Sequence, residues 1–176
     1  EKELAAVLGA NGSHIWELAN GIDPREVETT GEVKSISNEH TFEKNTSDKS
    51  RILDIIMHLS EKVSRRLRED GIRGKTITLK IRTGKFKTYT RALTIGEATN
   101  FVEDIYSSAV KKLDEFDLTN VKVRLVGVKV SNLLNSSWDE DLFSGVSEES
   151  MKKERIHRAV DRLVNKFGPD AVRRRA

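Results

Sequence analysis

The feature that most constrains the fold is a change of hydrophobic period in the middle of the chain. From Asp48 onward, apolar residues recur every three or four positions: Ile52, Ile55, Ile56, Leu59, Val63 and Leu67. This spacing predicts a long amphipathic helix that ends near Gly71. The segment before it, residues 34–42, has the β-branched, alternating character of a strand. Because the apolar stripe of such a helix must be buried, strands and helix are expected to pack together.

Two further alternating runs follow the helix and predict a hairpin. Residues 76–83 and 86–95 are separated by Gly84-Lys85, which has the composition of a tight turn. In the first run one face carries Ile77, Leu79 and Ile81, and the other carries Thr76, Thr78, Lys80 and Arg82. In the second run alternation puts Arg91 on the face of Tyr89 and Leu93, unless a bulge moves it to the other side.

A second amphipathic helix from about Thr99 and a strand over residues 121–130 complete the order β-α-β-β-α-β across residues 34–131. This order predicts an α+β fold with a four-stranded antiparallel sheet, both helices on one face and the other face free for a partner. We expect two short helices in residues 1–21, interrupted at Gly9 and Asn11-Gly12, and a linker over residues 22–33. Residues 132–176 are expected to be a tail with a terminal helix over about 150–166.

The net charge is only +3, but it is unevenly distributed. Residues 1–33 carry two basic and seven acidic residues, whereas residues 34–95 carry fifteen basic and seven acidic. Clustering of this kind is typical of proteins that bind a phosphate backbone, with a solvated charged face as the common alternative. The chain has no cysteine, which excludes disulfides and thiolate metal sites and favours a reducing, cytoplasmic compartment. No segment is apolar enough to span a membrane, so no membrane partner is expected.

Nothing in the sequence predicts a catalytic centre or a metal site. The four histidines share no metal-ligand spacing, and strand alternation puts His40 opposite Glu39. Gly74-Lys75-Thr76 lacks the earlier glycine of a phosphate-binding loop and leads into a strand. The chain starts at Glu1 and its only methionines are Met57 and Met151, so we expect it to be part of a longer protein whose upstream sequence holds the chemistry.

The free face of the predicted sheet is the more informative surface. It combines small hydroxyls with the long cations Lys80 and Arg82, and Lys85 and Lys87 flank it at the turn. RNA readers usually present stacking aromatics on such a face, so contact with a duplex backbone is favoured over base stacking. Two alternatives stay open: a protein-interaction module whose basic charges are only solubilising, and an RNA-binding domain.

Three groups of residues carry a family resemblance: Leu18-Ala19-Asn20-Gly21-Ile22-Asp23; Lys34-Ser35-Ile36 with Glu39 and Thr41-Phe42; and Leu79-Lys80-Ile81-Arg82 with Phe86 and Thr90-Arg91. They resemble the thumb end, the linker and the little-finger domain of Y-family translesion DNA polymerases of the bacterial DNA polymerase IV type. The resemblance covers nearly the whole chain and is in register with the order of elements derived above. It implies that residues 1–21 are the remnant of a thumb.

The resemblance implies duplex primer-template DNA as a partner, held by its phosphates. Carried over by position, the DNA-binding residues would be Lys34, Ser35, Ile36, Ser37, Thr41, Lys80, Arg82, Lys85, Lys87, Thr90 and Arg91. Their role would be positioning rather than base reading. In this family the nucleotidyltransferase centre uses palm carboxylates and two magnesium ions. The palm and fingers are absent from this chain, which is therefore expected to bind DNA, to carry no cofactor and to polymerise nothing.

A short acidic and apolar peptide in the tail predicts a second partner. Asp139-Glu140-Asp141-Leu142-Phe143 resembles the peptide by which such polymerases dock on the sliding clamp. Asp139, Asp141, Leu142 and Phe143 are the expected clamp-binding residues, with Leu142 and Phe143 filling an apolar pocket. The peptide departs from the family pattern at Asp139, where glutamine is usual. An incidental match in the tail is the alternative.

Overall fold

The computed structural model describes the whole chain except residues 27–30, 136–147, 169–170 and 173–176. Its contacts separate two compact units, Glu1–Glu32 and Val33–Ala176. The first unit holds α1 (Lys2–Leu8) and α2 (Ala10–Ala19). The second holds β1 (Ser35–Thr46), α3 (Lys49–Glu69), β2 (Ile72–Thr83), β3 (Thr88–Thr99), α4 (Val102–Leu113), β4 (Val123–Asn135) and α5 (Glu148–Phe167). The finer division into thumb remnant, linker, little finger and tail stays a prediction.

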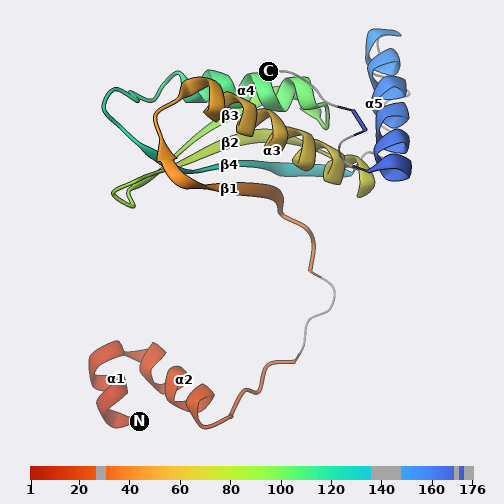
Figure 1. The fold of residues 1–176 in the computed structure, drawn as a ribbon. Helices are drawn as coiled ribbons and strands as arrows, with labels where there is room; N and C mark the ends of the chain where they lie inside the picture. The colour runs from red at the N-terminus through yellow and green to blue at the C-terminus, as the bar shows by residue number, and fades with distance from the viewer. Residues whose placement is uncertain (27–30, 136–147, 169–170, 173–176) are drawn as a thin grey trace. The chain divides into compact units, whose positions relative to one another are not determined.

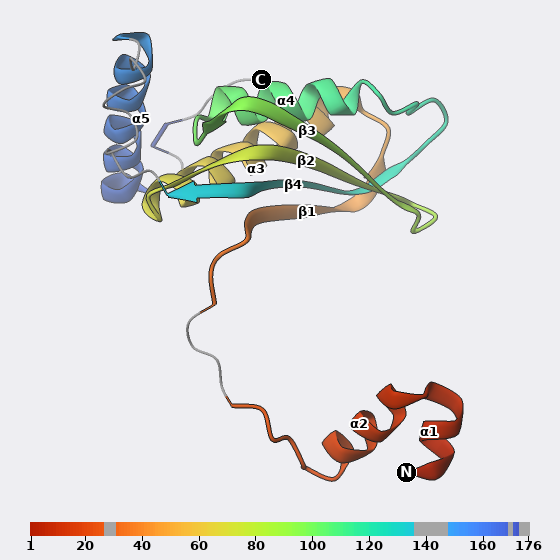
Figure 2. The ribbon, with the colours of Figure 1, turned by 180° about the vertical axis from the view of Figure 1, so that it is seen from behind.

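The second unit confirms the predicted α+β fold. Its four strands pair in the order β1-β4-β2-β3, and every neighbouring pair is antiparallel. The crossover from β1 through α3 to β2 passes β4, and the crossover from β3 through α4 to β4 passes β2, so each is a split βαβ unit. Figures 1 and 2 show α3 and α4 on the same face of the sheet. The opposite face carries none of the described helices of Val33–Ala176.

Strand alternation decides which side chains enter the core between the sheet and its helices. Eight inward residues of β1, β2 and β4 are at most 2% exposed: Ile36, Phe42, Ile77, Leu79, Ile81, Val126, Val128 and Val130. They meet the stripe of α3, with Ile52, Ile56, Leu59, Val63 and Leu67, and that of α4, with Ile105, Ala109 and Leu113. The long amphipathic helix is confirmed, and Asp48 caps it by accepting the N–H groups of Ser50 and Arg51 at 2.9 and 3.2 Å.

The two N-terminal helices form as predicted, but one of the two expected interruptions is wrong. Gly9 separates them with a φ of +60°, whereas Asn11 and Gly12 lie inside α2. A Cβ on Gly12 would lie 2.2 Å from the backbone oxygen of Leu4. Gly12 therefore serves the close approach of α1 and α2 rather than a turn.

The connection between β2 and β3 is longer than the predicted two-residue turn. Strand pairing stops at Thr83 and resumes at Thr88. Within the loop the Phe86 N–H donates to the Thr83 carbonyl at 2.9 Å, and the Thr83 N–H donates to the carbonyl of Lys87 at 2.9 Å. Phe86 takes a φ of +62°, so the left-handed residue that reverses the chain is Phe86 rather than Gly84-Lys85.

The terminal helix α5 is confirmed. Polar contacts hold it against α3 and α4, which we call the helix layer. The Arg68 guanidinium donates to both carboxylate oxygens of Asp161, at 2.7 and 2.8 Å. His157 is 2% exposed, stacks on Phe101 and lies 2.9 Å from a carboxylate oxygen of Glu103. Three apolar residues of this helix, Ile156, Leu163 and Phe167, stay 50, 45 and 64% exposed.

Replacing Asp161 by alanine is expected to release α5 from this layer. Arg68 and Asp161 are only 12% and 20% exposed, and loss of the carboxylate leaves a largely buried guanidinium short of a partner, which costs about 1–3 kcal/mol. In hydrogen exchange the α5 amides should lose protection while those of the sheet keep theirs. Arg162→Ala, an exposed change on the same helix, is the control. Equal α5 protection in both variants would contradict the contact.

Candidate nucleic-acid interface

The uncovered face of the sheet is organised in rows, because the strand pairing is regular across its middle. The register places in successive rows Ser35, Ser131, Thr76 and Thr94; Ser37, Lys129, Thr78 and Ala92; Glu39, Gly127, Lys80 and Thr90; and Thr41, Leu125, Arg82 and Thr88. We call this surface the open face. Its rows contain hydroxyls, three cations and one acid, and no aromatic residue.

Hydrogen bonds fix several of these side chains along the sheet. The Thr76 and Thr94 hydroxyls lie 2.9 Å apart, and Asn132 Nδ2 donates to Thr76 at 2.8 Å. Arg82 Nε donates to the Thr88 hydroxyl at 2.8 Å, which holds the guanidinium against the neighbouring strand. The threonines thus form a polar surface of short side chains, among which the longer cationic side chains lie.

The central row contains an ion pair that crosses a whole strand. Lys80 Nζ on β2 lies 2.8 Å from Glu39 Oε1 on β1, with Gly127 of β4 between them. The two side chains are 29% and 39% exposed, so the pair lies on the surface in contact with solvent.

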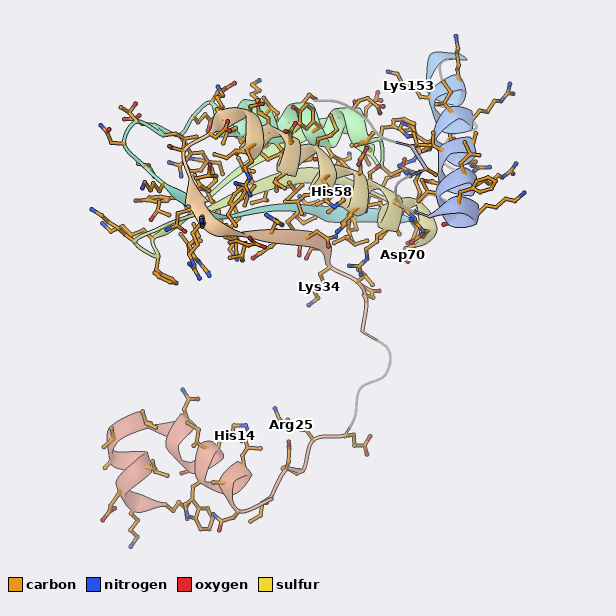
Figure 3. The ribbon with its side chains drawn as sticks, in the orientation of Figure 1. His14, Arg25, Lys34, His58, Asp70 and Lys153 are labelled. Atoms are coloured by element: carbon orange, nitrogen blue, oxygen red, sulfur yellow. The ribbon has the colours of Figure 1, made fainter. Side chains whose placement is uncertain are left out.

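Most of the residues predicted to bind DNA lie on one surface. The open face holds six of them: Ser35, Ser37, Thr41, Lys80, Arg82 and Thr90. Lys85 and Lys87 lie in the exposed loop that follows β2. Lys34 is exposed just before β1, and its side chain points away from the layer of α3 and α4 (Figure 3).

Two of the predicted residues lie elsewhere. Ile36 is 2% exposed and belongs to the core, so only its backbone can reach a ligand. Arg91 pairs with the buried Leu79, and its guanidinium lies over the Phe116 ring at 5.2 Å, on the helix side of the sheet. The pairing between β2 and β3 is regular from Thr76 to Arg82, so the bulge that would have turned Arg91 to the open face is absent there. Arg91 thus takes the face that alternation predicted, that of Tyr89 and Leu93, and its role in DNA binding stays a prediction.

Two residues of the open face escaped the sequence-based prediction. Lys129 is exposed and lies between Ser37 and Thr78. Its signal was its position between Val128 and Val130, which alternation alone turns to the opposite face. Glu39 was named beside His40 and among the residues of the family resemblance, but its pairing with Lys80 could not be found without the strand order.

Nothing on the described part of the chain adds a catalytic arrangement to this surface. No group of three or more histidine and acidic side chains gathers as metal ligands within the described residues. Among the described residues, no group with a displaced pKa belongs to the rows of the open face. Hydrogen bonds from Arg25 lower the pKa of Asp23 to about 2, bonds from Thr119 lower the pKa of Asp117, and burial raises the pKa of Tyr106. Among the described residues no helix is long and apolar enough to cross a membrane.

The peptide predicted to dock on a clamp, with Asp139, Asp141, Leu142 and Phe143, lies outside the described residues.

The chain is similar to a known protein family and to several curated proteins. A family model described as the impB/mucB/samB family C-terminal domain matches residues 33–142. DNA polymerase IV of Brucella melitensis biotype 1 is 36% identical over 174 residues, which are 98% of this chain and 38% of the relative. DNA polymerase IV of Desulfatibacillum aliphaticivorans is 33% identical over 98% of this chain and 44% of its own. That of Staphylococcus aureus strain MRSA252 is 34% identical over 78% of this chain and 39% of its own.

Among solved structures, a complex of the β-clamp processivity factor and the little-finger domain of PolIV matches with a TM-score of 0.47 and 24% identity, over 55% of this chain and 86% of that one.

Fold and surface together define a module with a helix-covered face and an open, cationic, hydroxyl-lined face. The chain belongs to the impB/mucB/samB family, of which it contains the C-terminal domain. The relatives named DNA polymerase IV confirm the family predicted from the sequence. The chain spans between 38% and 44% of the length of these relatives.

Proposed function

We propose that this chain is the DNA-gripping C-terminal part of a translesion DNA polymerase, and that the open face holds the backbone of duplex primer-template DNA. The observation that carries the proposal is the composition of that face, where Lys80, Arg82 and Lys129 rise from rows of threonine and serine. Cations neutralise phosphates, and hydroxyls donate to phosphate oxygens without discriminating between bases. The face is therefore suited to positioning a duplex of any sequence.

The loop between β2 and β3 and the start of β1 extend the same cationic surface. Lys85 and Lys87 are exposed in the loop, and Lys34 is exposed where β1 begins. Each cation that meets a phosphate releases condensed counterions, so the affinity should fall steeply as the salt concentration rises.

The competing functions differ in what would occupy this face. Single-stranded RNA or DNA is usually held by stacking on aromatic side chains, and the rows of the open face have none. A protein-interaction module would need a partner complementary to a polar, cationic surface. The three relatives compared above, each named DNA polymerase IV, favour duplex DNA as the ligand.

We assign nucleotidyl transfer, with its magnesium ions, to the longer protein of which this chain is a part. The described residues gather no carboxylate cluster that could hold such ions, so no chemical step is assigned to this chain. A cytoplasmic location is part of the proposal, and the absence of cysteine from this chain is compatible with it. A sliding clamp is the second proposed partner, supported by the resemblance of Asp139-Glu140-Asp141-Leu142-Phe143 to a clamp-docking peptide.

The test is equilibrium binding of the chain to a primer-template duplex and to its separate strands across a salt series. We expect the duplex to bind more tightly, with a log-log salt slope of about −0.9 for each phosphate contact. Preference for single strands would favour the RNA-type alternative. No binding to any nucleic acid at low salt would overturn the proposal and leave a protein-interaction module.

A further inference from the structure

The ammonium group of Lys80, at the centre of the open face, is paired with a carboxylate of the same protein. Lys80 reaches across β4 and holds Glu39 at 2.8 Å, rather than extending toward a ligand. Glu39 is the only acid in the rows of the open face. A carboxylate and a phosphate compete for the same donors on a lysine ammonium group.

Gly127 makes this arrangement possible. It lies between Glu39 and Lys80 in the same row, and a Cβ at Gly127 would come within 2.8 Å of Glu39 Cγ. Gly127 is not among the residues with positive φ, so the backbone conformation does not demand a glycine. Instead, the absence of a side chain at Gly127 leaves the space in which the side chains of Glu39 and Lys80 meet.

The ion pair contributes little to the stability of the fold, so Lys80 can exchange Glu39 for another anion at low cost. Its members are 29% and 39% exposed, and ion pairs at such positions contribute only about 0.2–1 kcal/mol. Arg82, in the next row, is held by the neutral hydroxyl of Thr88 and keeps its charge uncompensated by any acid in the rows of the open face.

We infer that Glu39 is an internal competitor for phosphate: it holds Lys80 folded over Gly127 in the free protein and yields it to the DNA backbone on binding. This inference rests on the function proposed above and adds an element of regulation to it. The carboxylate lowers the affinity of the face and speeds release of the duplex, because every bound phosphate must displace it. Such a device suits a surface that has to move along a duplex without selecting a sequence.

Glu39→Gln is the direct test, since it keeps the shape of the side chain and removes its charge. We expect the variant to bind primer-template duplex about three- to tenfold more tightly than the unaltered chain at low salt, from the lost competition and the lost repulsion of phosphate. Asp114→Asn is the matched control. It removes one carboxylate and frees one lysine, Lys49 at 2.9 Å, on an exposed pair from the helix layer, and its effect should stay below about 1.5-fold.

A double-mutant cycle with Lys80→Ala separates exchange from simple repulsion. If Glu39 acts through Lys80, most of the gain from Glu39→Gln disappears when Lys80 is alanine. A gain that persists in full in the Lys80→Ala background overturns the exchange, and so does an affinity of Glu39→Gln equal to or weaker than that of the unaltered chain. If the unaltered chain binds no duplex, the proposed function fails and takes the inference with it. Binding without a gain refutes the inference alone.

Discussion

Replacing Lys80 and Arg82 together by alanine is expected to weaken binding to duplex DNA about a hundredfold, and by the same factor on unrelated sequences. Both side chains lie on the open face, and a hydrogen bond to a charged group contributes about 1.5–3 kcal/mol, of which 1.4 kcal/mol is tenfold in affinity. Because two phosphate contacts are lost, the log-log salt slope should fall by about two units. Fluorescence anisotropy on two duplexes of different sequence, each across a salt series, measures both quantities.

The matched control removes two cations from the helix layer. Arg66 on α3 and Lys111 on α4 are exposed, and their replacement by alanine changes the net charge by the same amount. If long-range attraction alone held the DNA, the two double variants would bind alike. A loss confined to one sequence would contradict a backbone-positioning role and would point to base readout instead.

Part of the expected loss comes from Glu39 rather than from the missing lysine. Without Lys80, the Glu39 carboxylate stands uncompensated beside the bound phosphates. Adding Glu39→Gln to the double variant removes that repulsion and should recover only a small part of the affinity. The Lys80 contribution obtained from a single substitution is therefore an upper bound, and the cycle with Glu39→Gln is needed to divide it.

The elements of the fold could be predicted because hydrophobic period is a local property. The period of 3.6 in α3 and the alternation in β2 are each visible in a short window, and the order of elements then limits the topology. The strand order is different, since it places β4 between β1 and β2 through contacts distant in sequence. The Glu39–Lys80 pair depends on that order, so a pattern in one strand could not reveal it.

The errors concern details that depend on a neighbouring element. The turn was placed at Gly84-Lys85 on composition, whereas the left-handed residue is Phe86, a bulky type that rarely accepts a positive φ. Gly12 was predicted to be a turn residue. The reason for a glycine there is its contact with the backbone of Leu4 in α1, a different helix, which a local pattern does not reveal. The docking side of α5 carries His157 and Asp161, and hydrophobic period contains no information on a contact made of polar groups.

Replacing Leu142 and Phe143 together by alanine is expected to abolish binding of the chain to a bacterial sliding clamp. Two large apolar side chains that fill a pocket each contribute about 1.5–3 kcal/mol, so their joint loss exceeds the affinity that a short peptide can retain. Binding to duplex DNA should be unchanged, because neither residue is among those proposed to hold DNA. Surface plasmon resonance on immobilised clamp, with a parallel titration of duplex, measures the two activities separately.

Val146→Ala provides the control within the same tail, because it also shortens an apolar side chain but lies beyond the resemblance to the docking peptide. It should leave clamp binding intact. Asp139→Gln restores the residue usual in the family, and a gain in clamp affinity is expected, since an amide both donates and accepts hydrogen bonds whereas a carboxylate only accepts. If the Leu142 and Phe143 double variant keeps full clamp affinity, the peptide is an incidental match. The function of the chain would then rest on its sheet alone.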